Sequence, residues 1–394
     1  MPDSLFKRAF IVYICLTLIE YGLLISGNSL LKFYGYAITF GWLFLGRNKM
    51  PNAKESKEII FFAIYLILAM ISLLWSDDVA TGSYYLLSMA NMIVLILVAS
   101  TLSWNKRDLN VLLFAFQLSA TIFSIFLIIK GQLYHGFSRS TLVVNGLEQD
   151  PNNLSAMLVI PTLISLWRIL NKQYITLLNR KYIVINYLFL GSCILAMLML
   201  SSRGGLFGLI CGSLFLLFFH NRFAQKNKIR SNKLYIITSI AIVCTILFFF
   251  IPHLDQETLK RLSFQRIRED KGSDRLLIWN IAFQQFLTAP LFGIGIGSFQ
   301  GITKVGVHNQ FIIVGVESGI VGFILFATSL IILFIKSFKS KTSLLPALLV
   351  GTFVVIFFLD AYNKKYFWNG ILLSIIILTM EKNSRRSNNQ LIHS

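Results

Sequence analysis

The stretch GVHNQFIIVGVESGIVGF, residues 306–323, begins with polar residues and continues as an apolar pattern with helical period. On a helix with roughly 100° per residue, the side that carries His308 also carries three glycines, Gly315, Gly319 and Gly322. Glu317 falls on the opposite side. GVESG is also a GxxxG motif, which lets a second helix approach closely within a membrane. The stretch predicts a tightly packed membrane helix that holds one histidine at its end.

Similar apolar runs recur along the whole chain, which has 394 residues, 56% of them hydrophobic and only 13% charged. Runs of about 18–25 apolar residues are long enough to cross a bilayer core of roughly 30 Å. We therefore predict an all-α polytopic membrane protein with about twelve transmembrane helices. The predicted spans are 9–26, 29–45, 58–75, 84–103, 109–129, 151–169, 182–201, 204–220, 234–251, 309–335, 343–360 and 366–380.

The basic residues are unevenly divided between the two sides of the predicted bundle. With a cytoplasmic N-terminus, 23 of the 36 Lys and Arg residues fall in inside segments, which agrees with the positive-inside rule. Orientation in the lipid bilayer thus explains most of the excess of basic residues behind the net charge of +19, and no nucleic-acid partner is needed to explain it. We predict a multi-pass protein of the cell inner membrane with both termini in the cytoplasm.

The spans divide the chain into four predicted regions. Residues 1–150 contain about five spans and an outer loop, and they offer no evident chemistry. Residues 151–251 contain helices six to nine, and residues 309–394 contain helices ten to twelve and a cytoplasmic tail. Residues 252–308 are the one soluble-like segment, and we predict that they form a small helical subdomain on the outer, periplasmic face.

Arg203 lies in LSSRGGLFGL, between two predicted spans with almost no loop. A charge at membrane depth is costly unless it faces a polar cavity or a partner. Gly204 and Gly205 follow directly and would allow a tight reversal and a close backbone approach. The alternative is an arginine that only snorkels to the interface.

Arg275 lies in GSDRLLIWNIAFQQF, which predicts an amphipathic helix along the outer interface with Ser273 or Asp274 as its cap. Arg275 then falls in the first turn, beside free backbone N–H groups. A guanidinium next to a helix N-terminus is suited to bind phosphate. The alternative is a surface arginine paired with Asp274.

His308 and Asp360 are the remaining candidates, because both fall on the outer side of the predicted bundle. The ordinary pKa of histidine, about 6.5, suits a general base for a hydroxyl group. Asp360 ends the eleventh span and could orient His308 or balance the arginines. Each residue also has a simpler interpretation, as an interfacial anchor or a helix-end carboxylate. A metal site is disfavoured because the five histidines form no close pair in sequence.

A basic pocket, a possible base and access from the lipid all face outward in this interpretation. Together they fit a substrate with a diphosphate head and a long hydrocarbon tail. Such a lipid-linked sugar carries its own leaving group, which suits a compartment without ATP.

Several short motifs occur in the same order as in the bacterial O-antigen ligase and polymerase superfamily, which the chain resembles from about residue 145 to 380. The matching elements are DPNN at 150–153, SRGGL at 202–206, GSDRLLIWNIA at 272–282, LFGIGIGSF at 291–299, His308 and Asn309 followed by Gly319 and Gly322, and Asp360.

The resemblance implies a GT-C-like membrane glycosyltransferase that needs no metal and no other cofactor. The donor would be a glycan on undecaprenyl diphosphate, and the acceptor would be a saccharide hydroxyl. It further implies that Arg203 and Arg275 hold the donor diphosphate, that His308 activates the acceptor or the leaving group, and that Asp360 supports the site. The matched motifs add three substrate-binding candidates, Gly204, Gly205 and Asn309.

A ligase would transfer the glycan to lipid A core, whereas a polymerase would transfer it to a second lipid-linked repeat. The short segment between Arg275 and His308 favours a polymerase, but all four key residue types of the ligase have counterparts here. We therefore predict a ligase, with a polymerase as the alternative. A transporter or flippase for lipid-linked sugars is less favoured, because ionisable residues inside the spans are few, with Glu20 and Lys32 in the first two helices.

Overall fold

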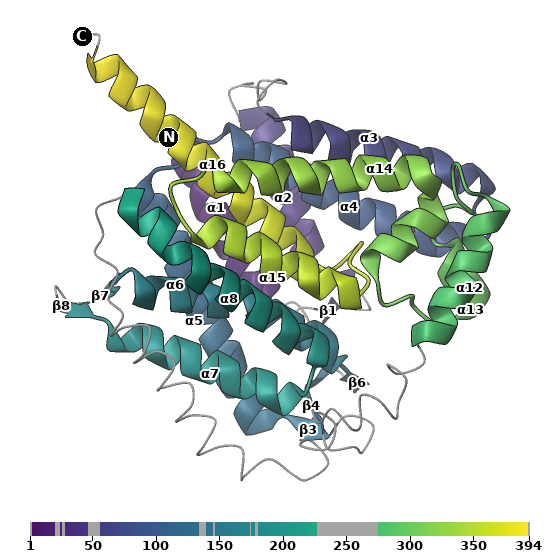
Figure 1. Cartoon of the computed structure of the whole chain (residues 1–394), viewed down its shortest axis with the longest axis horizontal. Helices are drawn as coiled ribbons and strands as arrows, with labels where there is room; N and C mark the ends of the chain where they lie inside the picture. Colours follow the sequence, from purple (N-terminus) through teal and green to yellow (C-terminus); the bar gives the residue numbers. More distant parts are fainter. Residues whose placement is uncertain are drawn as a thin grey trace.

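The computed structural model describes residues 2–19, 24–25, 28–45, 56–133, 139–144, 146–173, 175–177, 180–226 and 275–392. These residues form a helical bundle with short hairpins at its ends (Figure 1). The helices are α1 (Pro2–Thr17), α2 (Leu30–Leu45), α3 (Lys57–Ser72), α4 (Val79–Thr101), α5 (Lys106–Lys130), α6 (Pro151–Leu170), α7 (Val184–Leu200), α8 (Arg203–Lys226), α12 (Arg275–Thr288), α13 (Ser298–Thr303), α14 (Gln310–Phe338), α15 (Leu344–Phe358) and α16 (Lys365–Ile392).

A 3₁₀ helix, η2 (Leu73–Trp75), continues α3, and four antiparallel two-stranded hairpins lie between helices. The hairpins pair β1 (Leu24–Ile25) with β2 (Asn28–Ser29), β3 (Gln132–Leu133) with β4 (Ser140–Thr141), β5 (Val143–Val144) with β6 (Leu147–Glu148), and β7 (Ile175–Leu177) with β8 (Arg180–Tyr182).

Eleven of the twelve predicted spans coincide with helices, and the ninth, 234–251, lies outside the described residues. Within the described part, six helices are long and apolar enough to cross a membrane, and three shorter apolar helices accompany them. The six are Lys57–Trp75, Val79–Thr101, Lys106–Lys130, Pro151–Leu170, Arg203–His220 and Gln310–Phe338. The predicted all-α multi-pass architecture is confirmed, whereas the number twelve stays a prediction.

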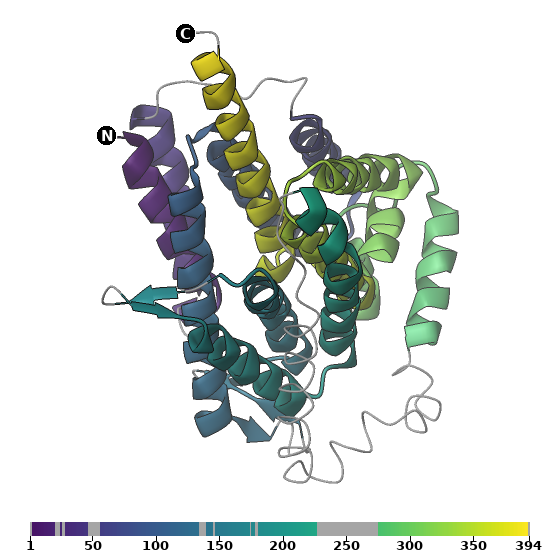
Figure 2. The same cartoon turned by 60° about the vertical axis from the view of Figure 1, so that its left-hand side comes forward.

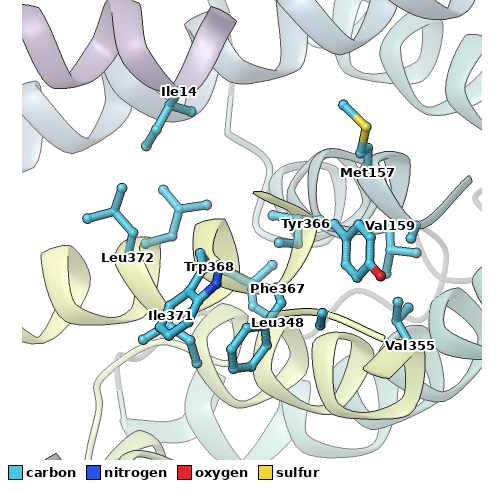
Figure 3. Close-up of a cluster of buried hydrophobic side chains, with 14 of the residues drawn as sticks. Ile14, Met157, Val159, Leu348, Val355, Tyr366, Phe367, Trp368, Ile371 and Leu372 are labelled. Carbon is cyan, nitrogen blue, oxygen red and sulfur yellow. The ribbon is translucent and has the colours of Figure 1, made fainter. Parts of the chain in front are cut away.

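The helix α16 passes through the middle of the bundle. Its residues 366–380 are buried almost throughout, and Figure 3 shows its aromatic and aliphatic side chains between α1, α6 and α15. There Tyr366 lies near Val159 of α6, and Leu372 faces Ile14 of α1. An apolar helix with no polar stripe is stable only when other helices or lipid surround it.

The outer helices pack in pairs, with α3 along α14 and α8 along α15 (Figure 1). Large apolar side chains remain exposed on them, including Leu74, Phe218 and, on α2, Phe44, which are 85%, 78% and 84% exposed. Such surfaces are unfavourable in water and match the hydrocarbon of a bilayer.

Two ion pairs join helices of the described part, one between the last turn of α14 and the first turn of α3 and one between α1 and the first turn of α5. Lys336 and Glu58 are 2.5 Å apart, and Lys7 and Asp108 are 2.7 Å apart. Figures 1 and 2 show the first turn of α1 and the last turn of α16 on the same side. The opposite end carries α12, α13 and the start of α14, so the predicted site residues lie far from the chain termini.

The helix α14 is interrupted at Gly319, where φ is 64° and ψ is −170°. A segment that we call the glycine loop, residues 289–297, packs against this break. Four backbone hydrogen bonds of 2.9–3.3 Å join the loop to the helix. The N–H groups of Ile294 and Gly295 donate to the carbonyls of Val316 and Glu317. The N–H groups of Ile320 and Val321 donate to the carbonyls of Pro290 and Leu291. The backbone groups that the break releases are thereby satisfied inside the protein, which is the condition for non-helical backbone at membrane depth.

The prediction of a helix packed on GVESG is therefore wrong in part. A Cβ at Gly319 would collide with the Leu291 backbone, so the close neighbour there is the glycine loop. A Cβ at Gly315 would meet nothing within 4 Å. A GxxxG pattern permits close approach either of a second helix or of a loop, and the tertiary structure shows that a loop approaches Gly319.

Replacing Gly319 by Ala should lower the thermal unfolding midpoint of the purified protein in detergent by several degrees. A side chain at this φ costs about 1–3 kcal/mol, and the clash with Leu291 adds to that cost. Gly315→Ala is the matched control, because its Cβ has open space and alanine favours helix by about 1 kcal/mol. Equal midpoints for the two variants would contradict this account of the break.

Candidate functional site

A cavity of about 520 Å³ opens beside the start of α14. Its wall comes from the first turns of α4, the start of α6, residues 299–308, the buried side of α14, and the segment between α15 and α16. Among the predicted site residues, His308 and Asp360 line this cavity directly. Segments far apart along the chain therefore meet at one point.

The carboxylate of Asp360 fixes the backbone just before α14. Its Oδ2 accepts the His308 N–H at 3.0 Å, and its Oδ1 accepts the Asn309 N–H at 3.1 Å. His308 has φ of 55° and lies outside the helix, so it does not crown the glycine stripe as the helical wheel suggested. Asn309 caps the helix by accepting the N–H groups of Phe311 and Ile312.

Further hydrogen bonds hold the two segments that meet at Asp360. The Gln310 side chain accepts the Ala361 N–H at 2.5 Å, and the Tyr366 hydroxyl donates to the Asp360 carbonyl at 2.8 Å. The indole of Trp279 in α12 donates to the Val307 carbonyl at 3.0 Å. The position of His308 is therefore set by contacts from α12, α15 and α16 together.

Arg275 and the backbone next to Arg203 both lie beside Phe358, two residues before Asp360. The Arg275 guanidinium lies over the Phe358 ring at 5.7 Å. Gly204, next to Arg203, packs against the same residue, since a Cβ there would lie 3.0 Å from the Phe358 Cβ. Neither arginine is part of the cavity wall, so the structure does not bring them into the cavity that His308 and Asp360 line.

The SRGGL turn is built differently from the expectation. The reversal is made by Ser201, with φ of 48°, and α8 begins directly at Arg203. Gly205 faces Ser155 of α6, and a Cβ there would collide with its hydroxyl. The predicted close approach is thus present, but it joins α8 to α6 and α15, and a substrate-binding role of Gly204 and Gly205 stays a prediction.

Several cavity residues come from parts of the chain to which the sequence assigned no chemistry. Thr81, Tyr84 and Tyr85 of α4 line the cavity, although residues 1–150 had offered only spans. Lys32 of α2 lies over the Tyr84 ring at 3.7 Å. The available signal was the pair of adjacent tyrosines near one end of a predicted span, which composition alone does not distinguish from an aromatic belt.

Arg139 is a second residue that the sequence did not single out. It is 5% exposed, and its guanidinium donates to the Leu200 carbonyl at 3.3 Å and to Asn152 at 2.8 Å. Asp150 caps α6 by accepting the Asn152 N–H. Arg139 therefore ties the DPNN element, which borders the cavity, to the turn that precedes Arg203.

The electrostatic state of the site follows from burial and from these hydrogen bonds. Burial raises the pKa of the Asp360 carboxyl, while the charge of His308 and the two N–H groups act in the opposite direction. At the rim, hydrogen bonds from the Thr81 N–H and hydroxyl lower the pKa of Asp78. Among the described residues, no three His, Cys, Asp or Glu side chains group as metal ligands. A metal-independent reaction stays a prediction.

Replacing Asp360 by Ala should speed backbone hydrogen exchange in peptides covering 305–312 by about tenfold or more. Two hydrogen bonds to a charged acceptor are lost, each contributing about 1.5–3 kcal/mol. Exchange in the second half of α14 should not change. Asp77→Ala, at an exposed carboxylate outside the cavity wall, is the control. Unaltered exchange at 305–312 in Asp360→Ala would show that the carboxylate does not hold this segment.

Comparison with known proteins finds a family match over part of the chain. Residues 187–327 match a family model described as O-Antigen ligase. The matched region contains Arg203, Arg275 and His308, whereas Asp360 lies beyond it. Members of this family are glycosyltransferase-like ligases and polymerases, which indicates a function of that general type.

No match was found among curated proteins. A solved structure described as "Structural coordination of polymerization and crosslinking by a peptidoglycan synthase complex" is similar at 14% identity and a TM-score of 0.44, covering 84% of this chain and 97% of that chain. A similarity of this size carries no argument about fold or function. The chain is therefore a multi-pass membrane protein whose residues 187–327 are similar to the O-antigen ligase family.

Proposed function

We propose that the chain transfers a glycan from a polyprenyl diphosphate carrier to a sugar hydroxyl at the outer face of the membrane. The observation that carries the proposal is the short segment 358–360, which joins two groups of different chemistry. Phe358 contacts the Arg275 guanidinium and packs against Gly204, next to Arg203, while Asp360 fixes His308 at the cavity. Because Phe358 and Asp360 are only two residues apart, this arrangement supports a donor diphosphate held close to an acceptor hydroxyl at His308.

The arginine side fits the donor. Two guanidinium groups stabilise a diphosphate by bidentate, charge-assisted hydrogen bonds. Phe207 and Phe357, about half exposed, are in ring contact with Phe358 and offer an apolar wall beside the arginines. Such a wall supports the binding of a hydrocarbon tail next to its charged head.

The cavity side fits the acceptor. In the proposed step, His308 accepts the proton of the acceptor hydroxyl, and the oxygen attacks the anomeric carbon of the donor sugar. The bond from that carbon to the diphosphate oxygen breaks, and the electron pair leaves with the diphosphate, whose charge Arg203 and Arg275 stabilise. Attack from the side opposite the leaving group inverts the anomeric centre.

Arg203→Ala, Arg275→Ala and His308→Ala should each lower glycan transfer by about 100-fold or more at normal membrane levels, because each removes a group that acts on developing charge. Arg203→Lys should also impair transfer, since an ammonium cannot form the bidentate contact. Arg107→Ala is the control, because Arg107 is exposed at the start of α5. Wild-type surface polysaccharide in all three alanine variants would refute the proposed function.

Ligase and polymerase activities differ in what accumulates when transfer fails. We propose the ligase reaction to lipid A core, with the polymerase as the alternative, which the compact segment from α12 to α13 supports. Loss of a ligase in His308→Ala should leave long glycan chains on the carrier lipid. Loss of a polymerase should leave single repeat units on the acceptor. Electrophoresis of lipopolysaccharide beside extracted carrier lipid separates these outcomes.

A further inference from the structure

The proposed function assigns a role to His308 and the arginines but leaves the inner wall of the cavity unused. We propose that this wall is the acceptor subsite and that it selects an uncharged, hydroxyl-rich sugar, held by Glu317 and by the tyrosine rings of α4. The inference rests on the proposed function for the direction of transfer. It adds the chemical class of the acceptor and the residues that recognise it.

Glu317 is the most informative residue of the wall. It is fully buried in α14, two residues before the break at Gly319, and it lines the cavity. Its Oε1 accepts the Phe299 N–H at 3.3 Å. Its Oε2 has no hydrogen-bond partner of suitable geometry among the described residues, although Tyr362 lies nearby. A buried carboxyl oxygen without a partner is destabilising, and a ligand hydroxyl would satisfy it.

The break in α14 explains why Glu317 can serve a ligand. In an unbroken helix its carbonyl would accept a bond from within the helix, but here it accepts the Gly295 N–H of the glycine loop at 3.0 Å. Gly293 lies against the same peptide, since a Cβ there would collide with the Glu317 carbonyl. The loop thus fixes the backbone of Glu317, which pre-organises its side chain at the cavity.

Three tyrosines supply flat apolar surface on the cavity wall. The rings of Tyr84 and Tyr85 are 6.0 Å apart, and those of Tyr85 and Tyr362 are 5.5 Å apart. The negative face of an aromatic ring attracts the weakly positive C–H groups of a pyranose. Lys32 lies over the Tyr84 ring at 3.7 Å, which holds that ring in place at the mouth.

The charged groups on the wall disfavour an anionic sugar. Three carboxyl groups line the cavity, those of Asp150, Glu317 and Asp360, against the single ammonium of Lys364 and the imidazole of His308. A carboxylate on the ligand would be partly desolvated beside these three acidic groups, with one ammonium on the wall to balance it, which disfavours its binding. The arginines lie outside this wall, so the diphosphate and the acceptor sugar have separate places.

The test measures binding to the full chain in lipid nanodiscs by saturation-transfer NMR. Methyl β-D-glucopyranoside and methyl β-D-glucopyranosiduronic acid probe the cavity, and farnesyl diphosphate probes the arginine side. We expect the neutral glycoside to bind at least about tenfold more tightly than the uronic acid. Glu317→Gln and Tyr84→Ala should each weaken glycoside binding about tenfold and leave farnesyl diphosphate binding unchanged. Arg275→Ala should weaken farnesyl diphosphate binding and leave glycoside binding unchanged.

Tyr187→Ala is the matched control, because Tyr187 lies on α7 outside the cavity. If Glu317→Gln does not fold, Tyr84→Ala decides the question, since Tyr84 is 44% exposed at the mouth. Equal affinity for the two glycosides, or unchanged glycoside binding in Tyr84→Ala, would overturn the acceptor subsite. Both results would leave the proposed function standing if Arg203→Ala, Arg275→Ala and His308→Ala still abolish transfer.

Discussion

The carboxylate of Asp360 joins the start of α14 to the end of α15 by accepting two adjacent backbone N–H groups. Every other feature of the site is positioned relative to this contact. It sets His308 in a left-handed conformation ahead of the helix cap at Asn309. A buried carboxylate is costly unless its oxygens are satisfied, so the two N–H groups make the charge tolerable and the carboxylate makes the unusual backbone persist. Neither segment would hold this shape alone.

The second constraint is the break in α14 and its repair by the glycine loop. A helix that is interrupted within a membrane must find partners for its released backbone groups, and residues 289–297 provide them. The result is a rigid junction of α3, α12, α13 and α14 at one end of the bundle. Ser72 and Ser76 extend the junction, since their hydroxyls contact the Ile296 backbone at 3.1 and 2.7 Å. Glu317 is presented to the cavity from this junction.

The site has two chemically different sides that the segment 358–360 links. On one side, the Arg275 guanidinium over Phe358 and the exposed phenylalanines suit a lipid with a charged head. On the other, carboxyl groups, amides and tyrosines suit a polyhydroxylated ligand. A transferase needs such a division, because donor and acceptor must be held at once and must not exchange places. The position of each basic residue therefore decides whether it can take part in the site, and the net charge of +19 does not indicate this.

The sequence by itself determined the apolar spans, three candidate side chains at or near their ends, Arg203, His308 and Asp360, and Arg275 at the start of a predicted amphipathic helix, because length, hydropathy and helix periodicity are local properties. Only the tertiary structure decided that Gly319 breaks its helix, since a GxxxG pattern serves a helix or a loop equally well. It also decided that Tyr84, Glu317 and Arg139 belong to the site, because their partners lie on other elements, up to hundreds of residues away. Contacts between residues so far apart in sequence leave no local pattern. The residues of the acceptor side could therefore not be predicted from the sequence.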